Sequence, residues 1–347
     1  METGQGGAPK ASASFDLFAL PIHGGDLTSA ELRFGRPAEG WLDLSTAINP
    51  YSYPIPPLDP LSWERLPDRS LDLALRVAAA ESYGVSSAEQ IAIAAGSQAI
   101  IQLLPRLRPF SHVLVIGPTY GEHTACWSNA GHQVQAGEDL DQAHSFEVVV
   151  VGNPNNPDGR RHDPAHLLFL ADGLAERGGL LVVDEAFVDC TPDLSLASKV
   201  RPGLLVLRSF GKFFGLAGLR LGFAIGDPDL IRLLRTAIGP WPVGGPALVI
   251  GRQALLDQSW IVAARRHLVM EAQALDALLN SANLSVLGGT PLFRLVNASR
   301  AWALYEHLGQ QGILVRPFAS APRWLRFGLP PGSKAMMRLK AALDIWQ

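Results

Sequence analysis

Short runs of valine, leucine and isoleucine recur through the middle of the chain and show no polar alternation. They are Val113–Ile116, Glu147–Val151, Leu180–Asp184 and the run that begins at Leu204. Stretches with helical spacing separate them. Strands that are buried on both faces form continuous apolar runs, whereas strands with one solvated face alternate. We therefore expect an α/β fold in which helices cover both faces of a mostly parallel sheet.

Polar and glycine residues gather where these runs end. Ligands of parallel sheets bind beyond the carboxyl ends of the strands. Gly96-Ser97-Gln98 also separates a short apolar run from a helical stretch, and such a turn can direct free backbone amides at a phosphate. An ordinary strand-to-helix turn has the same pattern. The other candidates at this edge are Tyr120, Asn153–Gly159, Asp184 and the segment from Ser209 to Lys212. The sequence thus predicts a ligand site there.

Lys212 is unusual among the five lysines of the chain because it lies between two apolar runs. A buried ammonium ion is costly unless it is paired or used as a neutral amine. A solvated loop lysine is the ordinary alternative. Ser209, three residues before it, and Arg220, eight residues after it, favour a functional lysine instead.

Composition points to a small-molecule partner. The chain has 347 residues, 48% of them hydrophobic, and a net charge of −3, so no basic surface for nucleic acid is indicated. Cys126 and Cys190 suggest neither a metal site nor a disulfide framework. The N-terminal residues lack a signal-peptide pattern, and no apolar run approaches membrane-spanning length. We expect a cytoplasmic protein without a metal, and no nucleic-acid or membrane partner.

Two segments resemble a known family. Ser-x-x-Lys followed by Gly-Leu-x-Gly-x-Arg-x-Gly, at 209–222, resembles the cofactor-lysine segment of pyridoxal 5′-phosphate (PLP) enzymes with the aspartate-aminotransferase fold. Asn153–Gly159 resembles their Asn-Pro-x-Asn-Pro-x-Gly loop. The match runs from about Asp43 to Leu329 and is closest to the histidinol-phosphate aminotransferase branch. It implies PLP-dependent transferase fold type I, with a large domain, a smaller α+β C-terminal domain, and a homodimer.

The resemblance also implies where the cofactor binds. Lys212 would hold PLP covalently, Asp184 would pair with the pyridine nitrogen, and Tyr120 would stack on the ring; these three are the expected catalytic residues. For Asp184 the alternative is an ordinary strand-end cap. Asn156 would donate to the ring hydroxyl. The phosphate would bind the backbone amides of Ser97 and Gln98. The hydroxyl of Ser209 and the guanidinium of Arg220 would complete its ligands.

Two departures from the family pattern narrow the resemblance. Phe187 and Leu66 stand where tyrosines are usual. Together with His-Gly-Gly at 23–25 and Trp-Leu-Arg-Phe-Gly at 324–328, these two replacements resemble the sequence pattern of the threonine-phosphate decarboxylases of cobalamin biosynthesis. These convert L-threonine O-3-phosphate to (R)-1-amino-2-propanol O-2-phosphate and carbon dioxide. The implied partner is a phosphorylated amino acid, and its expected ligands are His23, Gly24, Asn49, Arg316 and Arg326. Arg323 is expected at the surface.

We expect three parts in the chain: an N-terminal arm over residues 1–40, disordered at its start, a large PLP-binding domain over 41–247 and a small domain over 248–347. The proline-dense stretch Pro50–Pro67 is expected to be an extended loop without regular structure. An aminotransferase of the histidinol-phosphate type is the main alternative function. A non-catalytic PLP-fold binding protein is a remote one, since no basic helix-turn-helix pattern precedes His23. A dinucleotide site is excluded because Gly96-Ser97-Gln98 is not a G-x-G-x-x-G turn.

Overall fold

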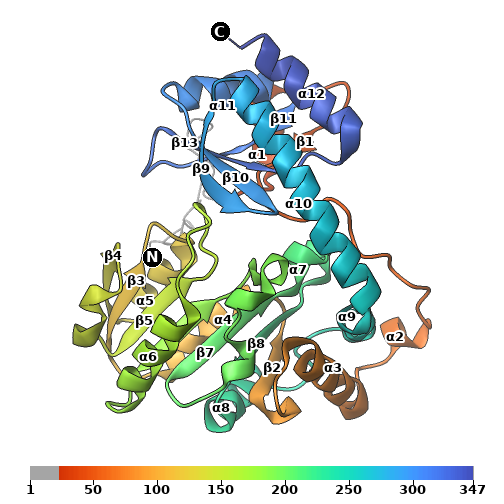
Figure 1. Cartoon of the computed structure of the whole chain (residues 1–347). Helices are drawn as coiled ribbons and strands as arrows, with labels where there is room; N and C mark the ends of the chain where they lie inside the picture. Colours follow the sequence, from red (N-terminus) through yellow and green to blue (C-terminus); the bar gives the residue numbers. More distant parts are fainter. Residues whose placement is uncertain (1–22, 347) are drawn as a thin grey trace, which may run out of the picture.

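A computed structural model describes residues 23–346; the start of the expected N-terminal arm, residues 1–22, lies outside the described residues. A seven-stranded sheet forms the centre, in the order β2-β8-β7-β6-β5-β3-β4 (Figure 1). Its strands are β2 (Ile91–Ala94), β3 (His112–Ile116), β4 (Gln133–Gly137), β5 (Val148–Gly152), β6 (Leu180–Asp184), β7 (Leu204–Ser209) and β8 (Gly222–Gly226). All neighbours pair in parallel except β8, which runs antiparallel to β2 and β7.

The apolar runs are buried because helices cover both faces of this sheet. In β5, Val149 and Val151 belong to one core, while Val148 and Val150 belong to a second core on the opposite face. The first core includes α3 (Arg69–Tyr83), α6 (Pro164–Ala175) and α9 (Gly245–Leu256); the second includes α4 (Ser97–Leu103), α5 (Gly121–Asn129) and α8 (Pro228–Ile238). The expected α/β fold is confirmed. Strand β4 was not predicted, because this edge strand is mostly solvated and lacks an apolar run.

A small antiparallel-sheet domain follows in the chain. Its order is β12-β13-β10-β9, formed by β9 (Ser285–Thr290), β10 (Phe293–Asn297), β12 (Arg316–Pro317) and β13 (Trp324–Gly328). The helices are α10 (Gln258–Ser281), α11 (Ala301–Gln310) and α12 (Gly332–Asp344). Figure 1 shows α10 running from the small sheet down beside the large one. A parallel pair, β1 (Leu42–Asp43) and β11 (Ile313–Leu314), joins the N-terminal region to this domain.

Two segments contain more regular structure than the sequence indicated. Within the expected arm, α1 (Leu27–Phe34) starts at Asp26, whose carboxylate accepts the amide of Ser29 at 3.0 Å. The expectation for Pro50–Pro67 is wrong in one place, where Leu61–Glu64 forms the one-turn helix α2. Its amide at Leu61 is capped by Asp59 at 2.9 Å, and the run 61–66 is free of proline.

Candidate active site

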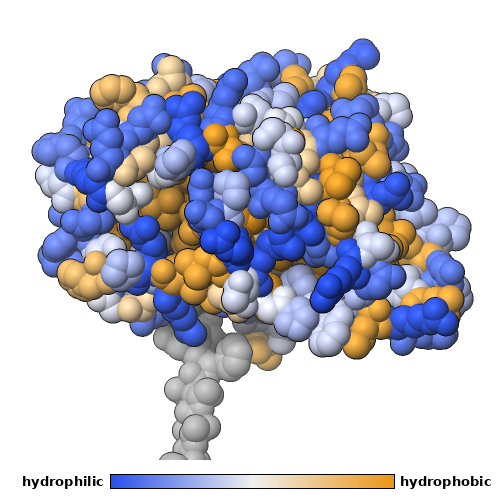
Figure 2. Space-filling view, turned by 90° about the horizontal axis from the view of Figure 1, so that it is seen from below, coloured by the Kyte–Doolittle hydropathy of each residue, from blue (hydrophilic) through white to orange (hydrophobic). Residues whose placement is uncertain are grey.

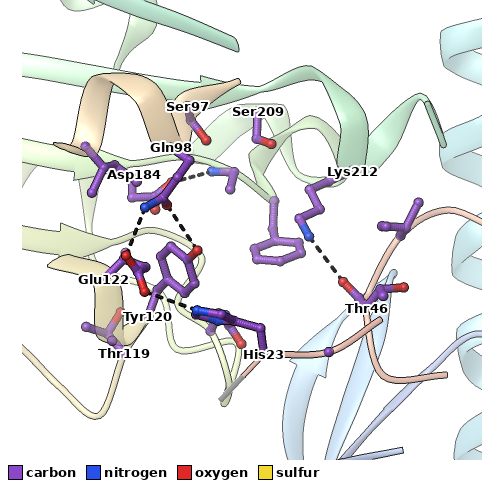
Figure 3. A pocket seen from close by; sticks show the side chains of 18 of the residues that line it. His23, Thr46, Ser97, Gln98, Thr119, Tyr120, Glu122, Asp184, Ser209 and Lys212 are labelled. Atoms are coloured by element: carbon purple, nitrogen blue, oxygen red, sulfur yellow. Dashed lines mark hydrogen bonds and ion pairs between the residues drawn. The ribbon is translucent and has the colours of Figure 1, made fainter. Parts of the chain in front are cut away.

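A pocket of about 750 Å³ opens at the carboxyl edge of the large sheet, and Arg316 and Arg326 of the small domain contribute to its lining. It brings together side chains that lie far apart in the chain. Those expected to bind cofactor all line it, namely Ser97, Gln98, Tyr120, Asn156, Asp184, Ser209, Lys212 and Arg220; of the expected substrate ligands His23, Gly24, Arg316 and Arg326 do so. Figure 3 shows many of these side chains converging from both sides of the cavity.

Lys212 lies on α7 (Phe210–Phe213), a single turn that directly follows β7. Its Nζ donates to the carbonyl of Thr46 at 3.2 Å and lies 5.9 Å from the ring centre of Phe187. Burial lowers the pKa of Lys212 to about 8, helped by the positive charges of Arg326 and Arg220. The lowered pKa therefore makes the neutral, nucleophilic amine of Lys212 accessible at a pH below the usual lysine range.

Asp184 ends β6 and is held at both carboxylate oxygens. Oδ1 accepts the amide of Ala186 at 3.0 Å, and Oδ2 lies 2.9 Å from Nε2 of His123. Both side chains are buried. His123 was not predicted, although it lies in the first turn of α5 next to the N-cap residue Tyr120, with the two ring centres 6.0 Å apart. This buried carboxylate suits a cationic ring nitrogen, which a ligand would supply.

The start of α4 is built to accept an anion. Gly96 has a φ of +85°, and a Cβ there would lie 2.5 Å from Nη2 of Arg220. A Cβ on Gly222 would lie 2.2 Å from the amide nitrogen of Ser97. Only glycine at both positions lets the guanidinium and the helix amides approach one another. These donors, with Ser209 beside them in the pocket, fit a phosphate group.

Arg326 connects the small domain to the large one. It lies on β13, where its guanidinium donates to Oδ1 of Asn156 and, at 2.6 Å, to the carbonyl of Ser45. Burial lowers the pKa of Arg326, with the nearby charge of Arg316 a second cause. Arg316 is its direct cross-strand neighbour on β12. Two guanidinium groups therefore enter the same pocket from adjacent strands.

Asn49, an expected substrate ligand, does not line the pocket. Its amide nitrogen donates to the carbonyl of Phe213 at 2.8 Å, and its oxygen accepts the amide of Tyr51 at 2.8 Å. Asn49 is 1% exposed and braces the loop beside Lys212. Its side chain thus serves the backbone.

Three further side chains that the sequence singled out are Phe187, Leu66 and Arg323. Phe187 lines the pocket and packs edge-on against Phe293, with ring centres 5.0 Å apart. Leu66 is 68% exposed. Arg323 donates to the side chain of Asn297 at 3.2 Å and is exposed, as expected.

Glu122 lines the pocket, and the sequence did not reveal it. One carboxylate oxygen lies 3.1 Å from Nε2 of His23, and the other accepts from Nε2 of Gln98 at 3.0 Å (Figure 3). The amide oxygen of Gln98 accepts the hydroxyl of Tyr120 at 3.1 Å. Its position two residues after Tyr120 was the one available indication, because its partners His23 and Gln98 come from other segments.

An amine, a buried acid and an anion cradle in one pocket fit PLP, and the fold and site together define the class of PLP-dependent enzymes of fold type I. Among residues 23–346, no cluster of His, Cys, Asp or Glu could hold a metal ion. No helix of that described part is long and apolar enough to cross a membrane.

Comparison with known proteins identifies the family. The model of the family "Aminotransferase class I and II" matches residues 58–342, and the chain belongs to this family. A threonine-phosphate decarboxylase of Pseudomonas aeruginosa is 46% identical over 92% of this chain and 96% of its own. One from a Sinorhizobium species is 44% identical over 93% and 97%. A histidinol-phosphate aminotransferase of Serratia proteamaculans is 30% identical over 82% of each chain.

Solved structures show the same fold. The histidinol-phosphate aminotransferase of Sinorhizobium meliloti, in complex with PLP, matches with a TM-score of 0.76 at 23% identity over 96% of each chain. The L-threonine-O-3-phosphate decarboxylase of Porphyromonas gingivalis matches with a TM-score of 0.73 at 18% identity, over 87% of this chain and 98% of its own.

Proposed function

We propose that the protein is a PLP-dependent carboxy-lyase that converts L-threonine O-3-phosphate to (R)-1-amino-2-propanol O-2-phosphate and carbon dioxide, a step of cobalamin biosynthesis. One observation carries the proposal. Relatives named threonine-phosphate decarboxylase are 44–46% identical over nearly the full length of both chains. Relatives named histidinol-phosphate aminotransferase are 30–34% identical and match 66–82% of this chain.

The charges in the pocket support this substrate. L-Threonine O-3-phosphate carries a carboxylate and a phosphate, so it needs cationic ligands beyond those that hold the cofactor. Arg326 and Arg316, opposite one another on β13 and β12, supply them. In the proposal Arg326 binds the carboxylate. Arg316, His23 and the backbone at Gly24 receive the phosphate.

Other residues of the pocket would hold the cofactor. Lys212 would hold PLP, Asp184 would face its ring nitrogen, and Tyr120 would lie against the ring. Asn156 would donate to the ring hydroxyl. The phosphate would be bound by the start of α4, Ser209 and Arg220. When bound, PLP supplies an aldehyde for the substrate amine and an electron-withdrawing ring that accepts the electron pair of the broken bond.

The protein's own groups then decide the outcome. Arg326 holds the carboxylate in a fixed orientation, so that the bond from Cα to the carboxyl carbon is the one that breaks. Carbon dioxide leaves without the electron pair of that bond. Lys212, with its lowered pKa, can hold a proton on Nζ and deliver it to Cα as a general acid.

The alternative is an aminotransferase of the histidinol-phosphate type, favoured by the relatives and structural neighbours with that name. Incubating the PLP-loaded enzyme with L-threonine O-3-phosphate, without a keto acid, separates the two. Release of carbon dioxide with PLP retained supports decarboxylation. Accumulation of pyridoxamine phosphate without carbon dioxide supports transamination and contradicts the main proposal.

The proposal includes a homodimer that works in the cytoplasm. Support for the dimer comes from large apolar side chains exposed on the proline-dense segment: Ile55 is 60%, Trp63 70% and Leu66 68% exposed. Light scattering on the purified protein tests it, and a monomer at all concentrations contradicts it. Two cysteines that form no disulfide support the cytoplasm. Fractionation of cells that express the protein tests that part, and recovery outside the cytoplasmic fraction contradicts it.

A further inference from the structure

Glu122 has no part in the mechanism above, although its carboxylate lines the same pocket. Among the described residues of the pocket wall it is the acidic side chain other than Asp184. It lies in the first turn of α5 and its side chain is 23% exposed. An acid among so many cationic groups would weaken anion binding unless its charge is used locally. Its contacts show such a use.

Glu122 lies at the centre of a chain of hydrogen bonds. Oε1 contacts Nε2 of His23 at 3.1 Å, and Oε2 accepts from Nε2 of Gln98 at 3.0 Å. Gln98 accepts the hydroxyl of Tyr120 at 3.1 Å. The thiol of Cys126 lies 3.9 Å from Oε2. Figure 3 shows the side chains of His23, Gln98, Tyr120 and Glu122 meeting at one wall of the pocket.

The chemistry of a carboxylate gives this chain a direction. An ionised carboxylate can only accept hydrogen bonds. Gln98 must therefore turn its NH₂ group toward Glu122 and its carbonyl toward Tyr120, whose hydroxyl donates. For the same reason Nε2 of His23 carries a hydrogen. Nδ1 is then the ring nitrogen of His23 left for another partner.

Two contacts hold His23, one through the neighbouring backbone and one through its imidazole ring. The backbone next to it is anchored by the amide of Gly25, which donates to the hydroxyl of Ser45 at 2.8 Å. A Cβ on Gly24 would lie 2.4 Å from the carbonyl oxygen of Ser45, so the two segments are in close contact. The imidazole itself is 51% exposed, and Glu122 is the charged group that holds it. Without that carboxylate the ring can rotate toward solvent.

We propose that Glu122 is a positioning residue for substrate phosphate, acting through His23. It turns the imidazole so that one nitrogen is bound to the protein and the other faces the phosphate subsite, and it orients Gln98 and Tyr120 at the same time. This inference rests on the proposed function, in which His23 contacts the phosphate. Its test separates the two.

The first measurement is steady-state kinetics of Glu122→Gln with L-threonine O-3-phosphate. The amide keeps the size of the side chain but places an NH₂ group against His23 or Gln98, both of which donate. Because the variant loses a partly exposed charged contact, we expect its KM to be about three- to tenfold higher than that of wild type and its kcat to change less than about twofold. Glu81→Gln, on the exposed side of α3, is the matched control and should behave as wild type. Glu122→Ala provides a second variant without the donor conflict, and KM should rise in both.

A double-mutant cycle identifies the route of the effect. If Glu122 acts through His23, then Glu122→Gln in a His23→Ala background raises KM no further than His23→Ala alone. Effects that multiply across the two substitutions overturn the inference. A fall in kcat without a change in KM also overturns it, since that result would place Glu122 in the chemical step.

Calorimetric titration of the PLP-loaded enzyme with inorganic phosphate makes the result independent of turnover. If the wild type releases no carbon dioxide, the proposed function fails, and phosphate affinity then judges the inference. Weaker binding in Glu122→Gln but not in Glu81→Gln supports it. Equal affinity in all three proteins, or no binding to the wild type, contradicts it.

Discussion

The imidazole of His123 and the carboxylate of Asp184 form a buried pair, with Nε2 and Oδ2 2.9 Å apart. The side chains are 2% and 11% exposed. Because Oδ1 already accepts the amide of Ala186, the carboxylate cannot turn. It is therefore held in the orientation that a pyridine nitrogen would need, by a residue that does not itself line the pocket.

Replacement of His123 should weaken catalysis without emptying the site. In His123→Phe the carboxylate of Asp184 loses its buried partner and its fixed orientation. We expect kcat/KM to fall about tenfold to a hundredfold, since a hydrogen bond to a charged group is worth about 1.5–3 kcal/mol. Steady-state assays of the PLP-loaded variant measure this. His132→Phe is the control, because His132 is also buried but bonds the carbonyl of Pro105, away from the pocket; equal losses in both variants would contradict a specific role.

Replacement of Lys212 by alanine should abolish both turnover and the visible absorption of lysine-bound cofactor. No other side chain in the described pocket carries an amine. Absorption spectroscopy and the carbon dioxide assay measure the two losses. Lys199→Ala, at an exposed position, should retain both. Normal turnover in Lys212→Ala would remove the lysine from the site.

Attachment of PLP to the cofactor-free protein should depend on pH through Lys212. The neutral amine attacks the aldehyde, and burial lowers the pKa of Lys212 to about 8 from the ordinary lysine value of 10.5. The rate of attachment should therefore rise through pH 8 and level off above it. Arg326→Gln removes a positive charge that lowers this pKa, so its midpoint should lie at higher pH. Stopped-flow absorbance gives both profiles; an unchanged midpoint in Arg326→Gln would contradict the electrostatic cause.

Phe187→Tyr should restore a phenol beside the cofactor ring. Phe187 is 5% exposed and lies near Nζ of Lys212. A phenol that donates to the ring oxygen would favour the anionic form of that oxygen. The pH midpoint of the bound cofactor's absorption should fall by up to about one unit, equivalent to one hydrogen bond. Phe110→Tyr, at a position 65% exposed, is the control. A titration curve identical to that of wild type would show that no such bond forms.

Arg208 should be essential for stability. It is 4% exposed, forms ion pairs with Glu185 and Asp189, and lies 4.2 Å from the ring centre of Tyr83. Arg208→Met leaves two buried acids without their cation. We expect a loss of about 3–5 kcal/mol in the free energy of unfolding, measured in urea.

A surface arginine provides the comparison for that measurement. Arg201 pairs with Asp172 at 2.9 Å, but both side chains are partly exposed. Arg201→Met should change the free energy of unfolding by no more than about 1 kcal/mol. Similar losses for the two arginines would show that burial of the Arg208 cluster does not matter.

Much of the fold could be predicted from local sequence. The runs that form β3, β5, β6 and β7 are apolar at consecutive positions because both faces of the sheet are covered. Strand β4 was missed because it lies at the edge, with most of its side chains in solvent. The turn α2 was missed because prolines before Leu61 suggested a loop, whereas Asp59 caps a turn there.

Part of the candidate site, like part of the fold, could be predicted from local sequence. Local sequence was enough to predict that Lys212, Asp184 and the start of α4 gather at one edge, because parallel strands end on the same side of a sheet. Which side chains touch one another depends on how distant segments pack. His123 and Asp184 are 61 residues apart, His23 and Glu122 come from separate segments, and Arg326 reaches Ser45 across 281 residues. A hydrogen bond requires its atoms to lie within about 3 Å. Spacing along the chain carries no information about distances between segments so far apart, so these contacts, and the position of Asn49 outside the pocket, were set by packing.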